Sequence, residues 1–78
     1  MKLTWNQRRA LERLVDCGGD ATPRNVAEPP RLGGNYLCGS AARTTLMALA
    51  RKGLAECIPA SPIRYRITAA GRNLIEGR

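Results

Sequence analysis

Arginines are the residues whose placement most suggests chemistry in this chain. Arg43 and Arg51 recur at helical spacing, and Arg64 and Arg66 alternate two residues apart further along. Guanidinium groups neutralise phosphates and release their counterions, which favours binding to a polyanion. The alternative is that these arginines only solvate the surfaces of a helix and a strand. The absence of acidic residues from residues 39–55 favours the first interpretation.

Residues for catalysis or metal binding are sparse. Histidine is absent, and the six Asp and Glu residues show no pairing that indicates a catalytic dyad. Cys17, Cys38 and Cys57 are widely spaced and form no Cys-x-x-Cys pair, which argues against a zinc site. We expect three reduced, partly buried thiols; a nucleophilic Cys38 is the other interpretation. The sequence thus predicts a protein that is not an enzyme and uses neither cofactor nor metal.

Length and charge limit the class of protein. The 78 residues suffice for one domain, residues 1–78, which buries about 60 to 65% of its unfolded surface. The net charge of +7 favours nucleic acid as a partner. No apolar run approaches the length of a membrane span, and the N-terminal segment lacks the apolar stretch of a signal peptide. We expect a cytoplasmic protein with no membrane contact.

The first helix has clear start and stop signals. Thr4 and Gln7 form a capping box, and Gly18-Gly19 favours the left-handed geometry that ends a helix. Leucines between these signals recur at helical spacing and predict one buried face. We expect Trp5 to cover the core beside this helix, with stacking on nucleic acid as the alternative.

A short second helix leads into a long connection. Thr22 is the expected cap of this helix and Pro23 its first residue. Pro29-Pro30 must end it near Ala27 or Glu28. Residues 28–39 then form a connection of a length that is uncommon in compact domains and often functional when ordered. Tyr36 in this connection has two equal interpretations, an accessory contact to a partner or a plug for the core.

The third predicted helix, residues 40–52, has two distinct faces. Ser40 is its expected cap, and Gly53 is expected to end it with Leu54 as the accompanying apolar contact. Helical spacing divides its side chains into an apolar face, with Ala42, Thr45, Leu46, Leu49 and Ala50, and a second face, with Arg43, Thr44, Met47 and Arg51.

The last third of the chain predicts a hairpin followed by a helix. Residues 54–58 and 63–68 alternate like strands, and residues 59–62 contain two prolines and form a tight turn. In the second strand Arg64 and Arg66 lie on the face opposite Tyr65. Thr68 is the expected cap of a final helix that ends near residue 75.

Two short motifs carry a resemblance to a known family: Ala42-x-x-x-Leu46-x-x-Leu49-x-x-x-Gly53-Leu54, and then Tyr65-Arg66-Ile67-Thr68-x-x-Gly71. Over about residues 11–75 the chain resembles winged helix-turn-helix regulators of the MarR and PadR types. The resemblance implies an α+β fold with a three-helix core, a short two-stranded β-hairpin as the wing, and a C-terminal helix. It also implies that residues 40–52 form the recognition helix.

The connection at residues 28–39 is longer than is usual in the family, and the wing is shorter. Dimerisation helices of ligand-sensing members have no counterpart here, so no ligand sensor is expected.

These observations predict a small non-catalytic protein that binds double-stranded DNA, with the third helix in the major groove. The expected role is transcription regulation, and the minimal size suggests a phage or mobile element. About four to six phosphate contacts predict a slope of log affinity against log salt of about −4 to −5. The predicted DNA-binding residues are Ser40, Arg43, Thr44, Met47, Arg51, Arg64 and Arg66, with Arg24, Arg31, Asn35 and Tyr36 as accessory contacts.

A protein-interaction module or inhibitor is the alternative from another class. In that case residues 31–36 and the third helix dock onto a protein surface, because a fold does not by itself determine function. The sequence leaves open whether the protein is a monomer or a homodimer.

Overall fold

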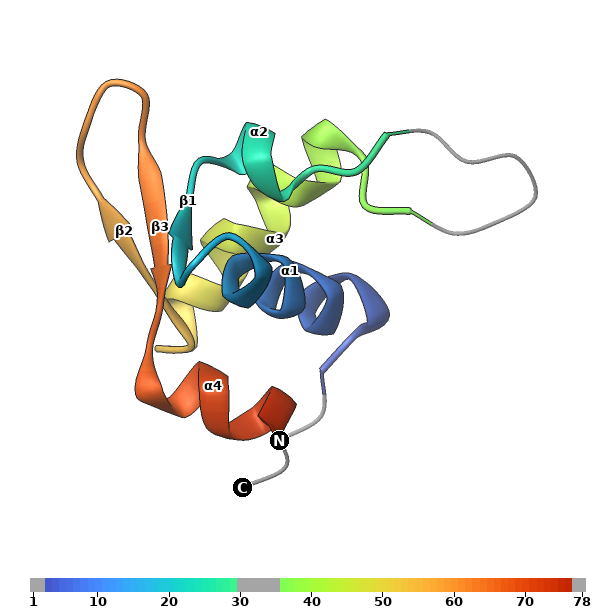
Figure 1. Ribbon diagram of the computed structural model, residues 1–78, viewed down its shortest axis with the longest axis vertical. Coiled ribbons are helices and arrows are strands. Elements are labelled where there is room, and N and C mark those ends of the chain that lie inside the picture. The colour runs from blue at the N-terminus through green and yellow to red at the C-terminus, as the bar shows by residue number, and fades with distance from the viewer. Residues whose placement is uncertain (1–2, 30–35, 77–78) are drawn as a thin grey trace.

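Short helices and strands follow one another in the computed structural model, which describes residues 3–29 and 36–76 (Figure 1). The elements in chain order are α1 (Trp5–Asp16), β1 (Asp20–Ala21), α2 (Pro23–Val26), α3 (Gly39–Arg51), β2 (Ala55–Ile58), β3 (Arg64–Ile67) and α4 (Ala69–Glu76). The described residues thus form a small α+β fold with four helices and a three-stranded antiparallel sheet.

The sheet has one strand more than the predicted hairpin. β3 lies in the middle, with β1 and β2 on either side of it. The sequence analysis predicted no strand before the second helix, whereas Asp20 and Ala21 form β1, which pairs with β3. Two residues are too few to show an alternating pattern in a sequence. β1 forms because the turn at Gly18 and Gly19 brings the chain to β3, where the Ile67 N–H donates to the Gly19 carbonyl over 2.8 Å.

α1 begins and ends where the sequence predicted. The Thr4 hydroxyl accepts the Gln7 N–H, and the Gln7 side chain accepts the Thr4 N–H, both at 3.1 Å. Gly18 and Gly19 follow the helix with φ angles of 89° and 104°. The prediction that Trp5 covers the core is wrong, since its side chain is 47% exposed. Trp5 lies on the side of α1 opposite the buried stripe that includes Gln7.

α2 is also capped as predicted. The Thr22 hydroxyl accepts the Asn25 N–H at 3.2 Å, and Pro23 occupies the first helical position, where its missing N–H has no partner to lose. The helix ends at Val26, whose side chain is fully buried. Arg13 of α1 donates to the carbonyls of Asn25 and Val26 at 3.2 and 3.3 Å, so it fixes the end of α2 against α1.

A buried ionic contact closes the base of the connection between α2 and α3. The Glu28 N–H donates to the Leu37 carbonyl at 2.7 Å, and the Leu37 N–H donates to the Glu28 carboxylate at 3.1 Å. Arg9 donates to both oxygens of the same carboxylate, at 2.9 and 2.5 Å. These hydrogen bonds raise the pKa of Arg9 above its ordinary value. We call Arg9, Glu28 and Leu37 the Glu28 clamp, because together they fix where the chain enters α3.

α3 differs from the prediction at its start and agrees at its end. Its N-cap is Cys38, which makes no side-chain capping bond, so the prediction of Ser40 as the cap is wrong. The Glu28 clamp orders the backbone up to Leu37, and the helix therefore begins earlier, at Gly39. At the other end Gly53 has φ 77°, and its N–H and that of Leu54 donate to carbonyls of the last turn, as in a Schellman motif.

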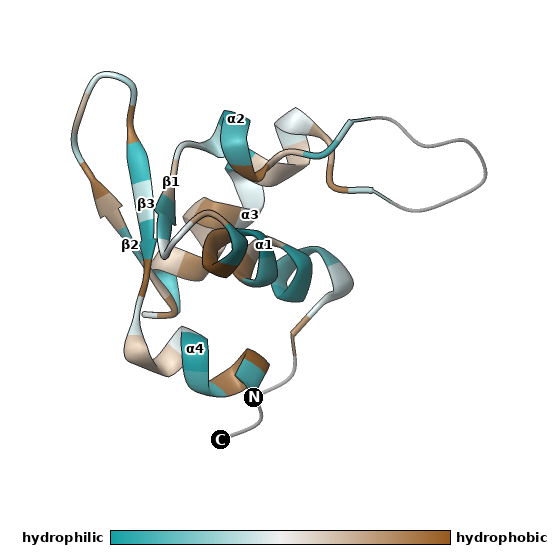
Figure 2. Cartoon of the chain, in the orientation of Figure 1, coloured by the Kyte–Doolittle hydropathy of each residue, from teal (hydrophilic) through white to brown (hydrophobic). Residues whose placement is uncertain are grey.

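The core lies where α1, α3 and the inner face of the sheet meet. Figure 2 shows brown, hydrophobic parts of α1 and α3 together near the centre of the molecule. The buried apolar residues are Ala10, Leu11, Leu14, Ala21, Val26, Leu37, Ala42, Leu46, Leu49, Leu54, Ala55, Tyr65 and Ile67. The predicted apolar face of the third helix is confirmed, with Ala50 only partly buried at its edge.

α4 packs closely against the turn that follows α3. The Thr68 hydroxyl accepts the Gly71 N–H at 3.2 Å, which confirms Thr68 as a cap, and it donates to the Gly53 carbonyl at 2.8 Å. A Cβ atom on Gly71 would overlap the Leu54 carbonyl oxygen. The glycine of the Thr-x-x-Gly motif is therefore required by the close approach of two backbones. Leu74 and Ile75 pack against the core as partly buried residues.

The three thiols are free, as predicted, but they are more exposed than expected. Cys17 and Cys57 are exposed and Cys38 is half-buried. Cys17 follows the last residue of α1, and Cys57 lies on the edge strand β2, opposite Tyr65 of β3. Within residues 3–29 and 36–76, no helix has the length and apolar character needed to cross a membrane.

Candidate nucleic-acid interface

The outward side of α3 carries five of the predicted DNA-binding residues. Their side chains are exposed, whereas those on the opposite side of the helix are buried in the core. Met47 is the most exposed apolar member, at 44%. We call this surface the α3 face, and it consists of Ser40, Arg43, Thr44, Met47 and Arg51.

The first turns of α3 define what its hydroxyl groups can do. Ser40 is the second residue of the helix, and its Oγ lies 3.6 Å from the Cys38 Sγ. The Thr44 hydroxyl donates to the Ser40 carbonyl at 3.2 Å. Because this hydroxyl proton is engaged, Thr44 can offer an outside partner its oxygen lone pairs and its methyl group, but no hydrogen-bond donor. The Ala41 N–H and the Ser40 hydroxyl lower the pKa of the Cys38 thiol.

Arg43 and Arg51 project from α3 without a carboxylate partner among the described residues. Arg43 also lies near the sheet: burial raises the pKa of Tyr65, and the charge of Arg43 opposes that rise. Two guanidinium groups of the α3 face are thus available to an anionic partner.

Arg64 is not available in the same way. Its Nη2 lies 2.5 Å from the Asp20 Oδ1, and this ion pair joins β3 to β1. A hydrogen bond from Arg64, with smaller effects of the Arg64 and Arg66 charges, lowers the pKa of Asp20. The sequence analysis treated Arg64 as a free cation because it did not predict β1, which supplies the carboxylate.

Arg66 lies between two acidic residues on the same face of the sheet. It is opposite Asp20 on β1 and opposite Glu56 on β2. Side chains that are directly opposite on neighbouring strands project to the same face. With Arg64 also on this face, two arginines and two carboxylates leave it with no net charge. The strand arginines therefore add little to a cationic surface.

The predicted accessory residues are in different situations. Arg24 is exposed on α2 and has no ion pair within the described residues. Tyr36 is half-buried, and the neighbouring Leu37 occupies the core. Arg31 and Asn35 lie outside the described residues.

Exposed cations without a carboxylate partner among the described residues are found on α2 and α3, and at Arg8 of α1. In α1 and α4, Arg9 contacts Glu28 and Glu12, and Arg72 lies 3.9 Å from Glu76. By contrast, Glu28 is the one acidic residue in the sequence from residue 21 to residue 55, and it is buried in the clamp. That segment contributes four cations to the described surface: Arg24, Arg43, Arg51 and Lys52.

A hollow beside the α3 face was not predicted. It measures about 390 Å³ and lies between the start of α2, α3 and the residues that lead into β3. Its lining residues are Thr22, Pro23, Arg24, Arg43, Pro62 and Ile63. Ile63 precedes β3 and is 37% exposed. The hollow depends on how the hairpin end approaches α2, and no pattern in the sequence encodes this approach.

Comparison of the chain with protein-family models, with curated proteins and with solved structures found no match. Function is therefore inferred from the geometry and charge of this chain. No three His, Cys, Asp or Glu side chains of the described residues are grouped as a metal site.

Proposed function

We propose that this chain is a non-catalytic winged helix-turn-helix protein that binds double-stranded DNA. In this proposal α3 is the recognition helix and the β2–β3 hairpin is the wing. The observation that carries it is the α3 face, where two arginines without carboxylate partners lie in a stretch of sequence with no exposed acidic residue. The order of α2, α3 and the hairpin supports the same assignment.

The α3 face has the dimensions and chemistry for the major groove. The groove is about 12 Å wide and accepts one α-helix. Arg43, in the first half of α3, is proposed to contact a guanine edge or a phosphate, and Thr44 and Met47 offer apolar contact to thymine methyl groups. Arg51, two turns further on, is proposed to contact the phosphate backbone.

The proposed contact set is smaller than the one predicted from the sequence, because Arg64 pairs with Asp20 and Arg66 lies among carboxylates. The cations proposed to contact phosphates are Arg24, Arg43, Arg51 and, as an addition to the predicted set, Lys52. About three or four phosphate contacts correspond to a slope of log affinity against log salt of about −3. The proposed role remains transcription regulation in the cytoplasm, with phage origin as an expectation from size.

The test compares Arg43→Glu with Tyr36→Ala for binding to a 20-base-pair duplex of mixed sequence, measured by gel shift. Charge reversal at Arg43 is expected to abolish the shifted band, and Tyr36→Ala to leave it unchanged. Both residues are at least partly exposed, so both variants should fold, and circular dichroism checks this. Duplex binding that survives Arg43→Glu would contradict the proposal and would favour the protein-interaction alternative.

A further inference from the structure

The hollow between α2, α3 and the hairpin has an apolar floor and two cationic sides. Pro23, Pro62 and Ile63 provide the apolar part. Thr22 adds little polarity, because its hydroxyl already accepts the Asn25 N–H at 3.2 Å. The charged groups are Arg24 and Arg43, one from each of two helices.

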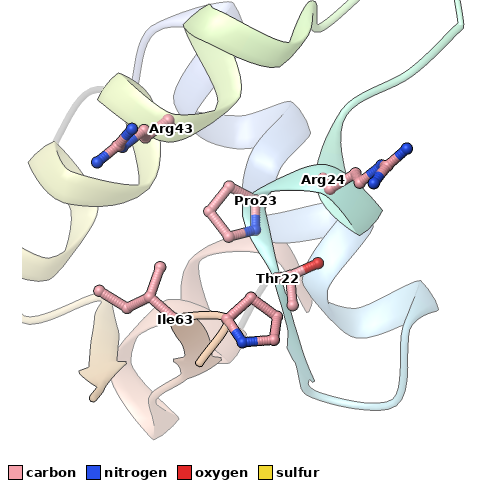
Figure 3. Close-up of a pocket in the computed structure, with 6 residues that line it drawn as sticks. Thr22, Pro23, Arg24, Arg43 and Ile63 are labelled. Atoms are coloured by element: carbon pink, nitrogen blue, oxygen red, sulfur yellow. The ribbon is translucent and has the colours of Figure 1, made fainter. Parts of the chain in front are cut away.

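The two arginines are arranged for a chain of charges and not for one anion. Figure 3 shows their guanidinium groups pointing away from each other on either side of Pro23. Neither has a carboxylate partner within the part of the chain that the structure describes. A polyanion that crosses the hollow would meet one guanidinium on each side.

We propose that this hollow seats a short stretch of one DNA strand. Sugar carbons lie against Pro23, Pro62 and Ile63, and phosphates on either side meet Arg24 and Arg43. The inference rests on the proposed function and adds to it the strand contact made beside the recognition helix. The alternation of cation, apolar floor and cation matches a sugar-phosphate backbone, in which apolar sugars alternate with phosphates.

The proposal gives the hairpin a role that does not depend on its arginines. The connection between β2 and β3 contains Pro59, Ala60, Ser61, Pro62 and Ile63 and no charged residue. Arg64 forms an ion pair with Asp20, so it is not a free cation. The wing therefore acts through apolar contact with the backbone, and the charge comes from α2 and α3.

The experiment measures affinity for a 20-base-pair duplex by fluorescence anisotropy between 50 and 200 mM salt. Arg24→Gln is compared with Arg72→Gln, which makes the same change of charge on α4, at the opposite end of the molecule from α2 (Figure 1). Each phosphate contact contributes about 0.9 to the slope, or about 3.5-fold in affinity over this range of salt. The slope for Arg24→Gln should therefore be shallower by about 0.9 than the wild-type slope, and Arg72→Gln should keep the slope and affinity of the wild type.

Two further measurements test whether a DNA strand binds in the hollow. Ile63→Ser should weaken binding severalfold with no change in slope, because it removes apolar contact and no charge. The second measurement uses duplexes in which one phosphate of one strand is replaced by an uncharged methylphosphonate. The affinity of the wild type should fall when the replacement is at either of two positions. The affinity of Arg24→Gln should be unchanged by the replacement at one of these two positions.

The outcomes separate this inference from the proposed function. Wild-type protein that ignores the duplex overturns both. If binding is tight and salt-dependent but Arg24→Gln and Ile63→Ser bind with the affinity of the wild type, only the proposed strand contact in the hollow is overturned. Displacement of the duplex by polyglutamate from the wild type, but not from Ile63→Ser, would also overturn it, because the hollow would then recognise an acidic peptide.

Discussion

Arg64 and Asp20 form an ion pair, with 2.5 Å between the Arg64 Nη2 and the Asp20 Oδ1, that connects the central strand of the sheet to its shortest strand. Both side chains are about 40% exposed, so solvent weakens the pair and its contribution to stability is small. Its main consequence is for function, because it withdraws one cation from the set that a polyanion could contact.

The pair predicts a specific effect of acid on stability. Because folding lowers the pKa of Asp20, its carboxylate stabilises the folded state above the unfolded value of about 3.9, and this contribution is lost as pH falls through the lower folded value. Wild type should therefore be more stable than Asp20→Asn at pH 6, and the difference should shrink below about pH 4. Urea unfolding at several pH values measures it. A difference that stays constant down to pH 2 would contradict the assignment.

Glu28→Gln should destabilise the fold more than a surface change does. The carboxylate of Glu28 is buried and accepts hydrogen bonds from Arg9 and Leu37, so neutralising it should cost about 1 to 3 kcal/mol of unfolding free energy. Glu12→Gln is the matched control, since Glu12 contacts the same guanidinium at 3.5 Å but is exposed, and its cost should stay within about 0.5 kcal/mol. Equal effects would contradict the role of the clamp.

Gly71→Ala tests the contact between α4 and the end of α3. The added methyl group would meet the Leu54 carbonyl and the side chains of Ile67 and Leu11, with a cost of about 1 to 3 kcal/mol despite the better helix propensity of alanine. Gly39→Ala provides the control, because open space surrounds that position and no loss is expected there. Thermal unfolding compares the two, and equal melting temperatures would refute the close approach.

Cys38 should react as an acidic thiol. The Ala41 N–H and the Ser40 hydroxyl stabilise its thiolate, so its pH midpoint for alkylation should lie below the ordinary value of about 8.5. Iodoacetamide labelling followed by mass spectrometry can measure this for each thiol. The midpoint should return to the ordinary value in urea, and Ser40→Ala should raise it in the folded protein. Identical midpoints in the folded and unfolded states would contradict the geometry.

Much of the fold could be predicted from the sequence because its signals are local. The Thr4–Gln7 capping box, the Thr22 cap and the glycines that end α1 and α3 act within a few residues, and all appear where expected. The two faces of α3 follow from one helical period. By contrast, β1 is two residues long and exists through pairing with β3, which no local pattern reveals.

The candidate site could be predicted in part for the same reason. Residues on α3 share a face whatever surrounds them, so Arg43, Thr44, Met47 and Arg51 were found. Whether a cation is paired depends on tertiary contacts, and Arg64 was therefore misjudged. The Glu28 clamp and the hollow lined by Pro23 also join segments far apart in the chain.

The salt dependence of duplex binding tests the central claim most directly. For the wild type, log affinity against log salt should fall with a slope of about −3, and Arg43→Gln should make the slope shallower by about 0.9. The charge-neutral variant Asp20→Asn with Arg64→Gln should keep the wild-type slope, because it removes both members of the ion pair. A slope near zero for the wild type, or a slope unaffected by Arg43→Gln, would contradict a cationic α3 face that binds DNA.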